Sequence, residues 1–175
     1  MTTRTDTQHA MPHNHGLSAT ALVNTFTRLC AQIPNSLIAF VARFSIAAVF
    51  WKSGQTKIQG IAIDLVNGEF TLAWPKLSDS VVSLFQYEYQ LPLVPPELAA
   101  TMAAFAEHFF PILILLGLAT RFSALALLVM TMTIQVFVYP GAYPTHGVWA
   151  AVLLYLMARG PGRFSVDHLI ARRLG

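Results

Sequence analysis

Hydrophobic residues gather in four long segments of the chain, which polar stretches separate. These segments cover residues 36–57, 97–119, 121–139 and 145–159. A bilayer core of about 30 Å takes roughly 20 mostly apolar helical residues, so three segments are long enough to cross it and the fourth is somewhat short. Pro140, Gly141 and Pro144 interrupt the apolar run between the last two segments. The pattern predicts an all-α membrane protein, a bundle of four transmembrane helices.

The segments before the first span are polar or mixed. Residues 1–17 predict a disordered polar tail, since they contain no apolar run. Residues 18–35 carry apolar side chains at helical spacing, which is typical of an amphipathic helix at a membrane surface. The frayed start of the first span is the alternative interpretation of that segment.

A long loop, residues 58–96, joins the first two spans. Within it, residues 61–66 and 69–74 flank Asn67-Gly68, a pair that predicts a β-hairpin because both residues accept positive φ. A short amphipathic helix is expected after Ser78. We expect this loop to lie over the outer leaflet. The membrane domain then extends over residues 36–170, and residues 171–175 form a basic tail.

Composition supports the membrane interpretation. Only 11% of the 175 residues are charged and 55% are hydrophobic, whereas soluble domains contain about 25% charged residues. The net charge of +3 comes from residues at the ends of the apolar segments, so no nucleic-acid surface is expected. A single cysteine, Cys30, excludes an internal disulfide and a paired-thiol redox motif. No metal site is expected.

Basic residues near the spans predict the orientation of the chain, because cytoplasmic loops of membrane proteins are enriched in Lys and Arg. With a cytoplasmic N-terminus, three lysines lie outside: Lys52, Lys57 and Lys76. Seven arginines then lie inside: Arg4, Arg28, Arg121, Arg159, Arg163, Arg172 and Arg173. The pattern predicts a multi-pass protein of the bacterial inner membrane with both termini cytoplasmic.

Charged residues inside the spans are the strongest candidates for function, because an unpaired charge in a bilayer is costly. Arg43 lies in the first span and Glu107 in the second, at similar estimated depths. We therefore expect a buried Arg43–Glu107 pair that lines a polar site, with His108 beside it. The alternative is an ion pair that only holds the bundle together. A lone His in a span is more often a structural hydrogen-bonding group than a metal ligand.

One face of the first span carries further candidates. Arg43, Phe50 and Lys57 recur every seven residues, and Gly54 lies close to the same stripe. Such a face can guide an anionic or carbonyl-bearing ligand inward. In the simpler alternative, Lys57 only extends toward the lipid phosphates.

Four short motifs resemble the DoxX family. They are the segment of residues 43–57, Glu107, the segment of residues 117–121 that ends in Arg121, and the segment of residues 160–167 with Gly160, Pro161, Gly162 and Asp167. They occur in the family's order, and the similarity covers residues 38–170. The resemblance implies a small bacterial inner-membrane protein with four helices. The family takes its name from a subunit of a thiosulfate:quinone oxidoreductase, and the resemblance assigns no catalytic residue.

Together these observations predict a membrane subunit of a quinone-linked redox system. Arg43 is expected to donate to a quinone carbonyl oxygen and Glu107 to exchange a proton, with Gly54, Lys57 and His108 as further binding candidates. The chain has no evident electron carrier of its own, so a cofactor or a protein partner would carry out the reduction. A non-enzymatic membrane scaffold is one alternative. A small-solute transporter or channel is another, and four helices would form a pore only in a homo-oligomer.

Overall fold

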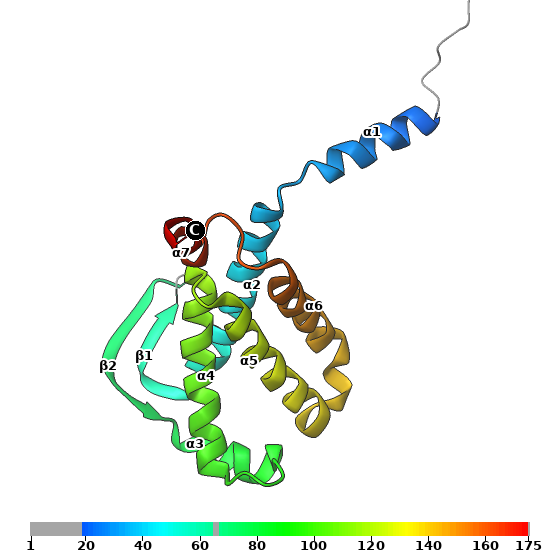
Figure 1. Cartoon of the computed structure of the whole chain (residues 1–175). Helices are drawn as coiled ribbons and strands as arrows, with labels where there is room; N and C mark the ends of the chain where they lie inside the picture. Colours follow the sequence, from blue (N-terminus) through cyan, green and yellow to red (C-terminus); the bar gives the residue numbers. More distant parts are fainter. Residues whose placement is uncertain (1–18, 65–66, 175) are drawn as a thin grey trace, which may run out of the picture. The chain divides into compact units, whose positions relative to one another are not determined.

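The computed structural model describes residues 19–64 and 67–174, and most of them are helical (Figure 1). The predicted polar tail, residues 1–17, lies outside the described residues. The chain divides into two compact units, residues 1–33 and 34–175.

The described part of the first unit, from residue 19 onward, contains one helix, α1 (Ala19–Ala31). All its side chains are exposed, and Leu22, Phe26 and Leu29 share one face of it. The helix ends before Pro34, whose extended backbone precedes the next helix and whose ring disfavours a helical residue before it. The segment is therefore a helix of its own, and its position at a membrane surface stays a prediction.

Four long helices form the bundle of the second unit (Figure 1). They are α2 (Asn35–Gln55), α4 (Pro96–Leu116), α5 (Thr120–Thr133), which continues through the π-helical turn η2 (Ile134–Val138), and α6 (Tyr143–Arg159). Among the described residues, three helices are long and apolar enough to cross a membrane: Asn35–Gln55, Pro96–Leu116 and Thr120–Val138. Helix α6 has 17 residues and spans about 26 Å. That α6 crosses the membrane as the fourth span stays a prediction.

Hydrophobic side chains fill the centre of the bundle and also cover its outside. Ile46, Phe50, Ile114, Leu127 and Leu153 are buried together between the long helices. Large apolar side chains also face outward from every one of these helices. Water-exposed surfaces rarely carry apolar patches of this extent, whereas a bilayer favours them.

Two strands follow α2. They are β1 (Ile58–Asp64) and β2 (Glu69–Leu77), which pair antiparallel with Asp64 opposite Glu69. Strand β1 folds back along α2, because the Gln55 side-chain oxygen accepts a hydrogen bond from the Ile63 amide at 2.9 Å and the Trp51 indole donates to the Ile63 carbonyl at 3.5 Å. Strand β1 thus lies along α2, and the position of the loop over the outer leaflet stays a prediction.

A short helical segment leads from β2 to α4. It consists of α3 (Asp79–Leu84) and the π-helical turn η1 (Phe85–Tyr89). Val81 and Phe85 are buried against Ala99 and Ala100 in the first turns of α4. This contact occupies the beginning of α4, so that only the later part of α4 is left to pack against α2.

The C-terminal helix α7 (Val166–Leu174) holds the turn between α4 and α5. Gly117 and Ala119 both have positive φ in this turn, at 71° and 46°. The Asp167 carboxylate accepts hydrogen bonds from the amides of Ala119 at 2.8 Å and Thr120 at 3.0 Å. The Asp167 amide in turn donates to the Gly117 carbonyl at 2.9 Å. One residue therefore satisfies backbone groups at the end of α4 and at the start of α5.

We predict that Asp167→Ala lowers the free energy of unfolding by about 1–2 kcal/mol, because it removes a side chain that caps the start of α5. The measurement is thermal unfolding in detergent micelles, followed by circular dichroism. Glu97→Ala is the matched control, since Glu97 is an exposed carboxylate in the first turn of α4. Equal losses in the two variants would contradict the capping role.

Candidate functional site

A buried ion pair joins the end of α2 to the middle of α4. The Lys57 ammonium lies 2.6 Å from the Glu107 carboxylate, and the exposed fraction is only 6% for Lys57 and 2% for Glu107. It is the only ion pair within the described part of the chain. Charges removed from water need both a partner of opposite sign and further hydrogen bonds. The pair therefore depends on the polar groups around it.

Ser53 and Gly54 complete the surroundings of this pair. The Ser53 hydroxyl donates to the second carboxylate oxygen of Glu107 at 3.0 Å and accepts a hydrogen bond from the Lys57 ammonium at 3.1 Å. Gly54 allows α2 to approach α4, because a Cβ atom there would lie 2.6 Å from Cε1 of His108 and 3.1 Å from Cβ of Glu107. The site is thus built on a helix contact that only glycine permits.

His108 lies beside the pair, and only one of its two ring nitrogens has a hydrogen-bond partner among the described residues. Its Nδ1 is 2.7 Å from the carbonyl oxygen of Ala104. Since a carbonyl oxygen only accepts, Nδ1 carries the hydrogen and Nε2 presents a lone pair. This Nε2 is buried and has no hydrogen-bond partner among the described residues. The Trp51 ring meets the imidazole edge-on, with the ring centroids 5.0 Å apart.

Arg43 lies elsewhere in the bundle, and the predicted Arg43–Glu107 pair is wrong. The guanidinium donates to the carbonyl oxygen of Phe164 at 2.5 Å and to that of Leu115 at 3.5 Å. It packs over Gly117, where a Cβ atom would lie 2.1 Å from its Nη1. Arg43 therefore binds backbone oxygens at the other end of the α2–α4 contact.

The register of the two helices explains this correction. Gly54 faces Glu107 and Gly117 faces Arg43, so α2 and α4 run antiparallel with these pairs in separate layers. Arg43 precedes Gly54 by 11 residues, a rise of about 16 Å along α2. The depth estimate treated the two spans as aligned at their ends. In the structure the first turns of α4 pack against α3 and η1 instead, which shifts Glu107 toward the end of α2.

An apolar cleft opens between α2, α4 and β1, and neither Lys57 nor Glu107 is among the residues that line it. It encloses about 580 Å³. Its wall is almost entirely apolar, and its lining includes Phe44, Ala48, Trp51, Ile63, Pro111 and Leu115. Trp51 belongs both to this wall and to the contact with His108. The cleft and the buried polar groups thus share one side chain.

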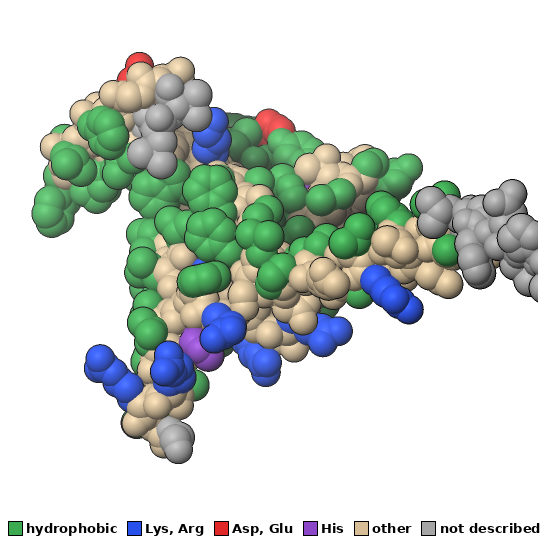
Figure 2. Space-filling model, turned by 90° about the horizontal axis from the view of Figure 1, so that it is seen from above, with side chains coloured by type: hydrophobic (Ala, Val, Ile, Leu, Met, Phe, Trp, Pro, Cys, Tyr) green, Lys and Arg blue, Asp and Glu red, His purple; other side chains and the backbone are tan. Residues whose placement is uncertain are grey.

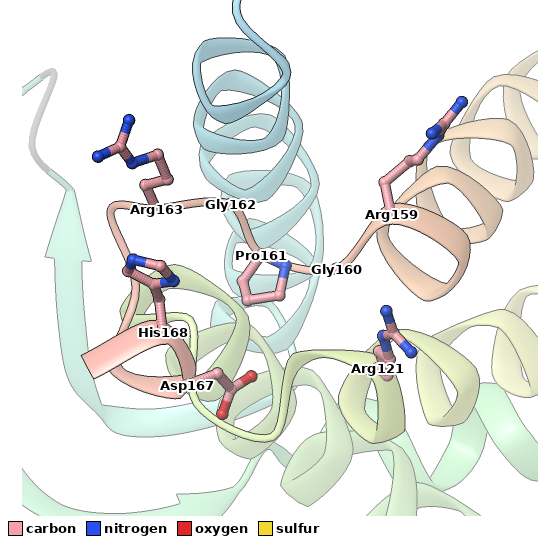
Figure 3. Close-up of a pocket in the computed structure, with 8 residues that line it drawn as sticks. All are labelled: Arg121, Arg159, Gly160, Pro161, Gly162, Arg163, Asp167 and His168. Atoms are coloured by element: carbon pink, nitrogen blue, oxygen red, sulfur yellow. The ribbon is translucent and has the colours of Figure 1, made fainter. Parts of the chain in front are cut away.

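The motif residues of the C-terminal segment gather around the start of α5 (Figure 3). Arg121, Gly160, Pro161, Gly162 and Asp167 line one shallow hollow, to which Arg159, Arg163 and His168 also contribute. A Cβ atom at Gly160, where φ is 77°, would lie 3.6 Å from the Arg121 guanidinium. The structure thus brings the predicted motif residues of this segment together, away from Glu107.

Three features of the site were missing from the sequence analysis: Ser53, Trp51 and the apolar cleft. Ser53 lies four residues before Lys57, a spacing that puts the two side chains on one helix face and that the pattern already contained. No sequence pattern indicates the cleft, because its wall depends on how β1 folds back over α2. Within the described residues, no group of three or more His, Cys, Asp or Glu side chains is arranged to hold a metal ion.

The sequence model of the DoxX family matches residues 38–140, more than half of the chain. The chain belongs to the DoxX family. An uncharacterized protein of Haemophilus influenzae is similar to this DoxX protein, with 25% identity over 148 residues that cover 80% of this chain and 87% of the relative. No solved structure matches it significantly. Its family and its apolar helices make it a membrane protein.

We predict that Glu107→Leu destabilises this DoxX protein by about 3–5 kcal/mol, because it leaves the Lys57 ammonium buried without its partner. The double variant Lys57→Met/Glu107→Leu should recover most of that loss, since an apolar pair of similar volume avoids the cost of burying charge. Denaturant unfolding in mixed micelles measures both values. A double variant as unstable as the single one would show that the pair itself is not the cause.

Gly54→Ala should also destabilise the protein, because the added methyl group collides with His108. Gly147→Ala is the matched control, since Gly147 is also helical and nothing lies within 4 Å of a Cβ atom there. Helix propensity alone favours alanine over glycine by about 1 kcal/mol, so the control should be neutral or more stable. Thermal unfolding of both variants measures the two effects. Equal changes in melting temperature would contradict the proposed close contact between Gly54 and His108.

Proposed function

We propose that this DoxX protein is the membrane subunit of a quinone-linked redox system and binds a quinone or quinol in the cleft between α2 and α4. The observation that carries the proposal is the position of Trp51. Its indole forms part of the wall of the apolar cleft and packs against His108, whose Nε2 is buried and unpaired among the described residues. An apolar slot thus meets a polar group that lacks a partner.

The cleft suits the apolar part of such a ligand. Sites for small molecules enclose about 300–1,000 Å³ and are mostly apolar, with a few polar groups that fix orientation. The volume of about 580 Å³ falls in this range. The lining comes from helices that are long and apolar enough to cross a membrane, so a lipid-soluble ligand would reach the cleft from the bilayer.

The neighbouring polar groups suit the exchange of a proton. His108 Nε2 presents a lone pair that can accept a hydrogen bond from a ligand hydroxyl. Glu107 can take up a proton, and Lys57 and Ser53 hold its carboxylate in one position. A quinol would supply two electrons and two protons when it is oxidised. The electrons would pass to a partner protein, since this chain offers a single, exposed cysteine.

The proposal changes the roles expected from the sequence. Gly54, Lys57, Glu107 and His108 belong to one site, whereas Arg43 is bound to backbone oxygens elsewhere. Arg43 is therefore no longer proposed as the donor to a ligand. Lys57 can donate to a ligand instead, whereas His108 can accept a hydrogen bond through Nε2.

The proposed setting is the bacterial inner membrane, with α6 as a fourth span and both termini cytoplasmic. The excess of arginine near the ends of α5, α6 and α7 supports this orientation, because the cytoplasmic side of membrane proteins is enriched in basic residues. A homo-oligomer and further protein partners are compatible with the exposed apolar helix faces.

A scaffold function is the second candidate. Strand β2 exposes Phe70, Leu72 and Trp74, with exposed fractions of 66%, 81% and 84%. A strand edge with large apolar side chains can pair with another protein by adding a strand. Only the redox function requires an open cleft, so a variant that fills the cleft distinguishes the two functions.

The test is the amount of quinone that copurifies with the protein from native membranes in a mild detergent. We predict that Ala48→Trp, which fills the cleft, lowers quinone per protein by about tenfold or more. Ala151→Trp is the matched control, because Ala151 is an exposed alanine on α6, outside the residues that line the cleft. It should retain the wild-type amount.

Glu107→Gln separates the polar site from the cleft, because glutamine keeps the size of the side chain but cannot exchange a proton at neutral pH. It should lower quinone content or, in membranes, the rate of quinol oxidation. Equal and negligible quinone in the wild type and in every variant would remove the proposal. Retention of partner proteins by the Ala48→Trp variant in that case would favour the scaffold.

A further inference from the structure

A hollow of about 250 Å³ lies at the end of the bundle that carries α7 (Figure 3). Its wall is the loop Gly160-Pro161-Gly162, between the end of α6 and the start of α7. The start of α5 closes the opposite side through Arg121. This hollow is separate from the cleft beside Trp51, and the two share no lining residue.

The charge of this hollow is unbalanced. Arg121, Arg159 and Arg163 line it, and none of them forms an ion pair within the described part of the chain. His168 adds another nitrogen group to the wall. The one carboxylate present, Asp167, already accepts two backbone hydrogen bonds at the start of α5. The wall of the hollow is therefore rich in arginine, with Arg163 on the other side of the loop from Arg121 and Arg159 (Figure 3) and Asp167 as its one acidic residue.

The backbone of the loop holds the hollow against the helix ends. Gly160 and Gly162 have φ of 77° and 79°, a conformation that other residues rarely adopt. A Cβ atom at Gly162 would lie 3.0 Å from the Cα of Ser36, so the loop presses against the start of α2. The Arg163 amide also donates to the Ser36 hydroxyl at 3.2 Å. The position of the hollow is thus determined by the packing of the helix ends.

We propose that this hollow binds the phosphate group of an anionic phospholipid. Arginine suits this role because its planar guanidinium offers paired donors to phosphate oxygens. Basic pockets between the ends of transmembrane helices are places where anionic headgroups bind. The volume accommodates a phosphate with part of its glycerol.

The neighbouring surface favours a lipid over a soluble anion. Helix α7 is amphipathic, with Leu169, Ile170 and Leu174 exposed along with Arg172 and Arg173. Such a helix lies in the plane of a membrane interface, where lipid phosphates are concentrated. Figure 2, which looks onto the end of the molecule that carries α7, shows basic side chains gathered around a histidine and hydrophobic side chains beside them. Acyl chains would find an apolar surface next to the hollow.

The experiment measures lipid binding to the purified full-length protein in neutral detergent micelles. Native mass spectrometry counts bound phosphatidylglycerol during a titration, with zwitterionic phosphatidylcholine as the reference lipid. We expect Arg159→Gln/Arg163→Gln to weaken phosphatidylglycerol binding by about tenfold or more, because it removes charge-assisted hydrogen bonds from two guanidinium groups to the lipid phosphate. Adding Arg121→Gln should weaken it further.

Arg172→Gln/Arg173→Gln is the matched control, because it removes two charges from α7, outside the hollow. It should change the affinity by less than about twofold if the hollow is the site. Equal losses in the two double variants would overturn the proposal in favour of general surface charge. Equal binding of both lipids by the wild type would overturn it as well.

Inorganic phosphate tests the source of the anion. Displacement of the lipid by millimolar phosphate would assign the hollow to a soluble anion and overturn the assignment to lipid. Arg159 and Arg163 are exposed, and unfolding of their variants is checked by circular dichroism without lipid. Arg159→Lys provides a second variant that keeps the charge but loses the paired donors. An intermediate loss of affinity is expected from it, and an affinity equal to that of Arg159→Gln would contradict the role of charge.

Discussion

The close approach of α2 and α4 governs the rest of the bundle. A Cβ atom at Gly54 would lie 2.6 Å from His108 of α4, and one at Gly117 would lie 2.1 Å from Arg43 of α2 and 2.4 Å from Ser165 of the C-terminal segment. These contacts favour one antiparallel register of α2 and α4. That register decides which charged groups meet, and in the low-dielectric interior of a membrane protein a misplaced charge is too costly to keep.

Two buried polar layers follow from this register. In one, Lys57 and Glu107 neutralise each other between α2 and α4. In the other, Arg43 is bound to the carbonyl oxygens of Leu115 and Phe164, and so ties α2 to the C-terminal segment. The first layer combines the Lys57–Glu107 ion pair with the Nε2 of His108, which is unpaired among the described residues, and this combination suits the exchange of a proton. The second uses its charge to hold backbone oxygens, which suits the assembly of the basic hollow at that end of the bundle.

How far the sequence predicted the site differs from residue to residue. Glu107 and Lys57 were identified because a charge in an apolar segment is conspicuous. Their pairing was not identified, because depth was counted from the ends of the segments. That count fails when one helix extends beyond its neighbour, as α4 does where Ala99 and Ala100 pack against Val81 and Phe85. A shift of a few helical turns between α2 and α4 therefore brings Lys57, and not Arg43, next to Glu107.

The sequence by itself determined the long apolar helices, the break at Pro140 and the residues that carry charge within the bundle. These properties follow from local rules: the length of an apolar run, the missing amide of proline and the cost of burying a charge. Only the tertiary structure decided that Glu107 meets Lys57, that β1 folds back to close a cleft and that Asp167 caps α5. Such contacts depend on helix offset and loop path, which arise from packing among residues far apart in the chain and leave no periodic trace in it.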